Sequence, residues 1–132
     1  MDNKNLEQAG NQPHRPDCVM IDAYGNGGFR FDNMSHKGNL LISPLGMFPW
    51  YTANQDAFSI EEVAPYISAL AQADILLLGM GKSIKPLPKE MLTWFEEKGL
   101  YPDIMDTGAA ARTYNVLFME KRSISALLFC VD

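Results

Sequence analysis

Cysteine and histidine are scarce in this chain of 132 residues, which contains two of each. Cys18 and Cys130 are far apart, form no C-x-x-C pair and have no histidine at the spacing of a zinc site. We therefore expect no bound metal. Isolated cysteines of this kind are typical of small buried side chains in a reducing compartment, so we predict two reduced thiols.

Long apolar runs are also missing. The longest, such as Ile75–Leu78, are far shorter than the ~18 residues that a membrane-spanning helix requires. Residues 1–16 include Asp2 and Glu7, and they have neither the apolar centre of a secretory signal nor the arginine-rich character of an organelle transit peptide. The sequence thus predicts a flexible tail over residues 1–16, then a single domain over residues 17–132, in a cytoplasmic protein.

Basic residues do not exceed acidic ones. The chain has 11 Lys and Arg against 16 Asp and Glu, a net charge of -5. This charge repels phosphate backbones, and no basic stripe interleaved with aromatic residues opposes it locally. Nucleic acid is therefore not an expected partner.

No complete catalytic or cofactor motif is present. Residues 78–83 read Leu-Gly-Met-Gly-Lys-Ser, but the phosphate-binding loop also requires a glycine where this chain has Leu76. Residues 25–30 lack the last glycine of the dinucleotide fingerprint and lead into a strand where a helix is needed. His14 and His36 belong to no nucleophile motif and are expected to be solvated. We predict no cofactor, no catalytic residue and no ATP binding at the first of these loops.

What the chain does contain is the pattern of one α/β domain. Its hydrophobic content of 47% and charged content of 20% are those of a globular protein. An early hairpin favours antiparallel pairing, and the later alternation of strands and helices favours parallel pairing, so the sheet should be mixed. Strands are predicted at residues 19–24, 29–31, 39–43, 74–79, 101–105 and 124–131, turns at 32–38, and helices after the capping box of Ser59 and Glu62, from Pro88 and at 108–122.

The start of the last predicted helix carries a charge that needs explaining. Asp106 or Thr107 can cap this helix, and Gly108 permits close packing. Arg112 follows on an otherwise apolar helix that we expect to be buried, so its charge should be paired. We favour an ion pair with Asp106 or another carboxylate. The alternative is an anion held jointly by the helix N-terminus and Arg112.

Aromatic residues gather in the segment Met47–Tyr51. Large aromatic side chains are mostly buried, which favours a satellite of the core. If part of the segment is exposed, its Phe48, Trp50 and Tyr51 are the candidate patch for a partner protein, because aromatic residues are enriched at interfaces.

Four groups of motifs then occur in one order: Tyr24-Gly25-x-Gly27-Gly28-Phe29-Arg30-Phe31; Ser43-Pro44-x-Gly46 with Trp50; Leu76-Leu77-Leu78-Gly79-x-Gly81; and Met105-Asp106-Thr107 continuing through Arg112-Thr113-Tyr114-Asn115. In these the chain resembles the family of the mitochondrial respiratory complex I assembly factor 3 and its prokaryotic relatives. The resemblance implies a three-layer α/β fold, with a mixed central sheet flanked by helices and a small N-terminal β unit. It implies an association with assembling a membrane-bound respiratory complex, and it does not imply an enzyme. Because no transit peptide is predicted, we expect a prokaryotic member.

Our leading hypothesis is a non-catalytic domain that binds a partner protein and helps respiratory or other membrane complexes to assemble. The alternative is a protein that binds a small molecule or anion, or an enzyme, using the loops after the strands that end near Gly79 and Met105, where open α/β sheets bind ligands. The residues expected to line such a site are Gly79, Gly81, Lys82, Asp106, Thr107, Gly108 and Arg112.

Overall fold

The computed structural model describes residues 17–54 and 57–132, and the predicted tail lies outside them. The strands are β1 Ala23–Gly25, β2 Gly28–Phe31, β3 Met34–Lys37, β4 Asn39–Ser43, β5 Gly46–Trp50, β6 Ile75–Gly79, β7 Asp103–Met105 and β8 Ile124–Leu128. The helices are α2 Ile60–Val63, α3 Ile67–Leu70, α4 Lys89–Glu97 and α5 Thr107–Met119, with the 3-10 helix η1 Ala64–Tyr66 between α2 and α3.

The central sheet has five strands in the order β5-β4-β8-β6-β7. β6 pairs in parallel with both β7 and β8, and β4 pairs antiparallel with β5 and β8. The predicted mixed sheet is therefore confirmed. Its two halves meet where β4 lies beside β8, although these strands are far apart in the sequence.

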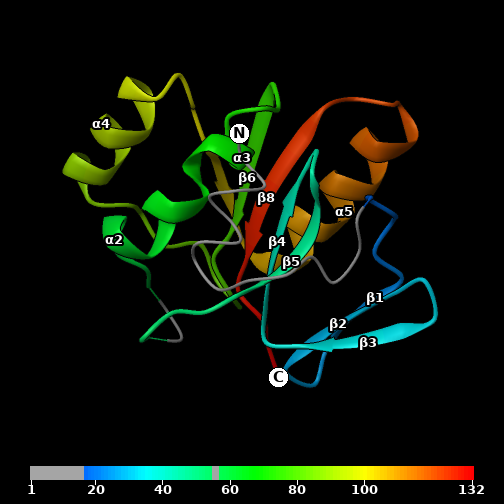
Figure 1. The fold of residues 1–132 in the computed structure, drawn as a ribbon. Helices are drawn as coiled ribbons and strands as arrows, with labels where there is room; N and C mark the ends of the chain where they lie inside the picture. The colour runs from blue at the N-terminus through cyan, green and yellow to red at the C-terminus, as the bar shows by residue number, and fades with distance from the viewer. Residues whose placement is uncertain (1–16, 55–56) are drawn as a thin grey trace.

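Helices cover both faces of this sheet, with α2, α3 and α4 on one face and α5 on the other (Figure 1). On one face, Leu76 and Leu78 of β6 pack in a core cluster with side chains of α2, α3 and α4. On the other face, Leu77 of β6 belongs to a second cluster with residues of α5 and the small β unit. Because both faces of β6 are covered, its sequence is apolar at almost every position. The three-layer arrangement is thus the one expected.

The small β unit is an antiparallel sheet in the order β1-β2-β3. The first predicted strand, residues 19–24, is in fact the shorter β1. Residues 32–38, predicted as turns, also contain β3, since the turn itself needs only Asp32 and Asn33, both at positive φ. This two-residue turn suits hairpin strands.

His36 on β3 corrects the expectation of a solvated histidine. Its side chain is only 5% exposed, and its Nε2 lies 2.8 Å from the carbonyl oxygen of Asn39. The imidazole also lies beside the ring of Phe31, with a centroid distance of 6.3 Å. His36 therefore lies on the face of β3 that is directed at the core, and not in a solvent-exposed turn.

The helices begin as their caps predict. Ser59 and Glu62 form the reciprocal capping box of α2, and Asp106 caps α5. The helix predicted after Ser59 is broken into α2, η1 and α3, with Pro65 in the first turn of η1, because proline lacks the amide that a continuous helix needs. Among the helices of the described ranges, none combines the length and apolarity needed to cross a membrane.

Candidate functional site

Two of the predicted site residues, Thr107 and Gly79, lie where the first turn of α5 contacts the carboxyl ends of β6 and β8. Thr107 is fully buried; its Oγ1 donates to the carbonyl oxygen of Phe129 at 2.7 Å and accepts from the amide of Gly81 at 2.9 Å. Gly79 lies so close to α5 that a Cβ there would be 3.1 Å from the Cα of Thr107 and from Ala110 Cβ. These residues set the position of α5 on β6.

Asp106 and Arg112 do not form the predicted pair. Asp106 Oδ1 accepts a hydrogen bond of 2.7 Å from the amide of Ala109, which is an N-cap contact. Arg112 is exposed, and no carboxylate of the described residues forms an ion pair with it. The prediction of a buried, paired arginine was wrong, because the face of α5 that carries Arg112 points away from the sheet although it is rich in apolar residues.

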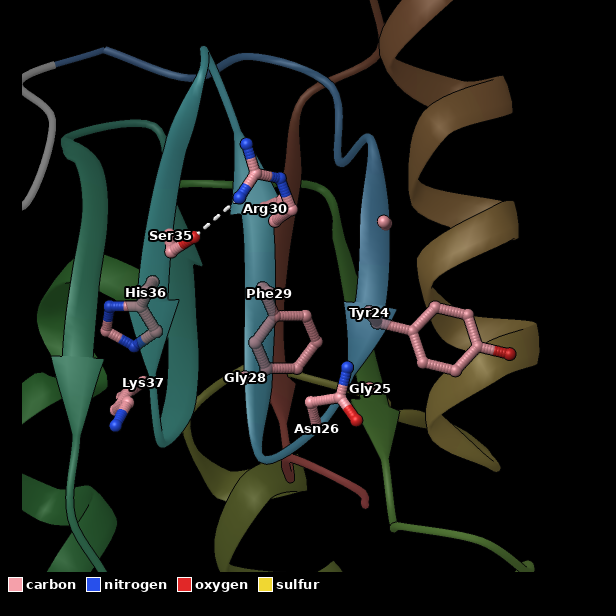
Figure 2. Close-up of a pocket in the computed structure, with 10 residues that line it drawn as sticks. Tyr24, Gly25, Asn26, Gly28, Phe29, Arg30, Ser35, His36 and Lys37 are labelled. Atoms are coloured by element: carbon pink, nitrogen blue, oxygen red, sulfur yellow. Dashed lines mark hydrogen bonds between the residues drawn. The ribbon is translucent and has the colours of Figure 1, made fainter.

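The neighbour of Arg112 across the chain is Tyr24 on β1. Figure 2 shows Tyr24 directed from the small sheet towards the adjacent helix, which is α5. A Cβ at Gly108 would collide with the Tyr24 hydroxyl and would lie 3.3 Å from Arg112 Nη1. The missing side chain of Gly108 therefore leaves room for the Tyr24 hydroxyl, and the Arg112 guanidinium lies close to the same point.

Exposed apolar side chains also occur on α5 and on the segment that runs along it. Arg112, Val116 and Met119 follow one another at helical spacing on the outer face of α5, where Val116 is 50% and Met119 63% exposed. The adjoining segment before and within β1 adds Met20 and Tyr24, which are 38% and 42% exposed. We call Met20, Tyr24, Arg112, Val116 and Met119 the α5 surface. Only Arg112 of these residues was singled out as a site residue from the sequence.

The aromatic segment is divided between core and surface. Phe48 and Trp50 are each 1% exposed and belong to the cluster under α2, α3 and α4, whereas Tyr51 is 70% exposed. The Trp50 ring packs on Phe58 and Phe129, at centroid distances of 5.5 and 5.3 Å. The candidate partner patch is thus reduced to Tyr51.

Gly81 and Lys82 lie in a cleft of about 430 Å³ at the carboxyl ends of β6 and β8. No helix begins at Lys82, because residues 80–88 are irregular and α4 starts at Lys89. The cleft unites segments that the sequence keeps apart, and its lining comprises Gly27, Gly38, Asn39, residues 50–52, residues 81–83, Lys85 and residues 130–132. Most of these residues carry no motif, so sequence reasoning missed them.

A second hollow of about 270 Å³ lies on the small sheet and is drawn in Figure 2. Arg30 Nη1 donates to Ser35 Oγ across β2 and β3 at 2.8 Å, and Lys37 lies further along β3. Gly28 is required in this sheet, since a Cβ there would collide with the backbone carbonyl of His36.

Two partly or fully buried titratable side chains, Tyr114 and Cys130, have a raised pKa. Burial raises the pKa of the Tyr114 hydroxyl, which donates to the carbonyl oxygen of Val19 at 2.9 Å. Burial also raises the pKa of the Cys130 thiol, and Cys18 and Cys130 form no disulfide in the described part of the chain. In the ranges that the structure describes, no three His, Cys, Asp or Glu side chains are grouped as metal ligands.

The structure thus defines a three-layer α/β domain with a mixed central sheet, a small β unit and an apolar, arginine-bearing surface beside its last helix. The chain belongs to the protein family of unknown function DUF498/DUF598, whose model matches residues 21–129.

Relatives place that family membership in context. An uncharacterized protein of Rhodobacter capsulatus is 38% identical over 117 residues, which cover 89% of each chain. The NADH dehydrogenase [ubiquinone] 1 alpha subcomplex assembly factor 3 of Danio rerio is 27% identical over 83% of this chain and 63% of its own length, so this chain spans less than two thirds of that relative. The crystal structure of an outer membrane protein from Bartonella henselae has 40% identity and a TM-score of 0.82, covering 90% of this chain and all of that one.

Proposed function

We propose that this chain is a protein-binding domain that assists the assembly of respiratory or other membrane protein complexes, and that it contacts its partner through the α5 surface. The observation that carries the proposal is the presence of four exposed large apolar side chains on α5 and on the adjoining residues 20–24, together with Arg112, which lacks an ion pair among the described residues. The similarity to assembly factor 3 supports the type of partner.

The physical reason lies in what an interface requires. Apolar side chains on a helix that already covers a sheet with its other face contribute nothing to the core, and water around them is unfavourable. Tyr, Met and Arg are the residues enriched in the centres of protein interfaces. The α5 surface has all three, with Tyr24 and Arg112 both close to Gly108. A partner that covers this surface would bury apolar area and supply a counter-charge.

The experiment compares assembled membrane complexes in cells that lack this chain and in cells given it back. We expect the wild type to restore the amount of intact respiratory complex on a native gel, and the double variant Val116→Glu, Met119→Glu to restore little, because two charges would be buried at the interface. Tyr101→Glu is the matched control, since Tyr101 is 71% exposed and lies outside the α5 surface. Full restoration by the double variant would contradict the proposal.

A second function is favoured by the cleft that holds Gly81 and Lys82. The indole Nε1 of Trp50, which lines this cleft, is buried and has no hydrogen-bond partner. A volume of about 430 Å³ suits a small ligand, and a hydrogen-bond acceptor on such a ligand could satisfy the indole. Native mass spectrometry of the purified chain tests this alternative, because a bound metabolite would add a discrete mass that Lys82→Ala reduces.

A further inference from the structure

Two donors from different elements converge on the first turn of α5. The hydroxyl of Tyr24, on β1, and Nη1 of Arg112, on α5, both lie against the Cα of Gly108, where any larger residue would displace them. Residues 21–24 and Ala111, Arg112 and Asn115 enclose a groove of about 480 Å³ beside them. Tyr24 and Arg112, which line this groove, also belong to the α5 surface.

Neither donor has an acceptor in the described part of the chain. No hydrogen bond or ion pair joins Tyr24 Oη or Arg112 to a residue there. Asn115 does not compete for a ligand, because its side-chain amide bonds both the amide and the carbonyl oxygen of Ile21, each at 2.8 Å. Asp22 lies in the same groove and is exposed, but it is not paired with Arg112.

The chemistry of these groups selects a ligand. A guanidinium presents a planar set of N–H donors that fits the two oxygens of a carboxylate, and a phenol hydroxyl adds one further donor. The nearby side chains of Val116 and Met119 are apolar and half exposed or more, so they offer nothing to a free hydrophilic anion. They suit the apolar side chains that flank an acidic residue in a peptide.

We propose that Tyr24 and Arg112 form a clamp for a carboxylate on a segment of a partner protein, and that apolar residues next to this carboxylate pack on Val116 and Met119. The clamp rests on the proposed function, because it specifies how the α5 surface recognises its partner. The carboxylate of Asp22, which lines the same groove, repels the bound carboxylate and so lowers the affinity.

A random peptide library displayed on phage supplies the probe. We expect the wild-type chain to select peptides with Asp or Glu next to large apolar residues. The affinity of a selected peptide for Arg112→Ala should be lower than for the wild type by about tenfold or more. Its affinity for Tyr24→Phe should fall by a smaller factor, since only the hydroxyl is lost. Gly108→Ala should also weaken binding while the melting temperature is kept, because the added methyl group displaces the Tyr24 hydroxyl.

Controls separate the clamp from a general effect of charge. Arg30→Ala removes an exposed arginine of the small sheet and should leave peptide affinity unchanged. Asp22→Asn should strengthen binding. Arg112→Glu should restore the binding of a peptide whose acid is replaced by lysine, which a merely structural arginine would not do.

The outcomes also distinguish the two proposals. If selected peptides show no enrichment in acidic residues, or if Arg112→Ala and Tyr24→Phe bind like Arg30→Ala, the clamp is overturned. If complex assembly then still depends on Val116 and Met119, the α5 surface remains the partner site without the clamp. If assembly is insensitive to all these changes, both proposals are wrong.

Discussion

At the scale of single residues, position relative to neighbouring elements decides the role of the polar groups near the sheet edge. Thr107 and Asp106 are adjacent in the sequence, yet one hydroxyl is buried between two strand ends and the other side chain caps a helix. Both follow from the sharp entry of the chain into α5. The sequence predicted a functional group at this point, and the structure gives both residues a structural contact.

Replacing Thr107 with Val tests the buried hydroxyl. The shape is kept, but the buried carbonyl of Phe129 and the partly buried amide of Gly81 each lose a partner. We expect a loss of about 2–6 kcal/mol in the free energy of unfolding, from about 1–3 kcal/mol for each of the two unsatisfied groups. Urea denaturation measures it, with Thr107→Ser as the control that keeps the hydroxyl; equal losses in the two variants would contradict the assignment.

Arg112 should contribute little to folding. Because its side chain is exposed and unpaired among the described residues, Arg112→Ala should change the free energy of unfolding by no more than about 1 kcal/mol. Asp106→Ala should cost about 0.5–2 kcal/mol through loss of the N-cap. Chemical denaturation of both variants and of the double variant should give additive losses. A coupling energy between the two sites would indicate an Asp106–Arg112 ion pair and would contradict the structure.

At the scale of elements, the start of α2 depends on one carboxylate. Glu62 accepts hydrogen bonds from the amides of Ser59 at 2.8 Å and Ala53 at 2.6 Å, and Ser59 Oγ accepts from the amide of Glu62 at 3.2 Å. Burial raises the pKa of Glu62, but the hydrogen bonds from Ala53 and Ser59 outweigh it, so the pKa falls below its ordinary value of 4.5. The capping box thus links α2 to the chain after β5.

This lowered pKa gives stability a pH dependence with a defined sign. The folded state holds the charged carboxylate more strongly than the unfolded chain does, so the stabilisation is present above pH 4.5 and is lost as the pH falls through the folded pKa. Glu62→Gln should therefore be less stable than the wild type at neutral pH, and the difference should shrink in acid. Thermal melts at several pH values would show it; a difference that grows in acid would be the wrong sign.

At the scale of the whole molecule, the small sheet is an integral part of the domain. Phe29 and Phe31 of β2 share a core cluster with Leu40 and Ile42 of β4, and the amide of Gly27 bonds the carbonyl of Val131 at 2.8 Å. Because this small sheet lies beside α5, it brings Tyr24 to the first turn of that helix (Figure 1).

We accordingly expect the two sheets to unfold together. Tryptophan fluorescence, which includes buried Trp50 of the central sheet, and far-ultraviolet circular dichroism should give coincident urea transitions, because apolar contacts between the sheets would be lost in any partial opening. Phe31→Leu changes a buried side chain of the small sheet, and it should move both transitions to the same lower midpoint. An early transition in only one signal would mean that the small sheet opens by itself.

The sequence by itself determined the elements that depend on local chemistry. The apolar run of β6, the capping box of α2 and the Asp106 cap of α5 are all readable because hydrogen bonds and apolar periodicity act over a few residues. The four groups of motifs, which occur in one order, predicted the family and hence the three-layer fold.

Only the tertiary structure decided which faces are covered. The burial of His36 and Trp50, the exposure of Arg112 and the meeting of Tyr24 with Gly108 all depend on strands and helices distant in sequence. A helix that is apolar around most of its circumference does not reveal which side faces the sheet, since that side is fixed by packing against β6 and β8. For that reason the arginine that the sequence placed in the core lies at the surface, beside a tyrosine more than eighty residues away in the chain.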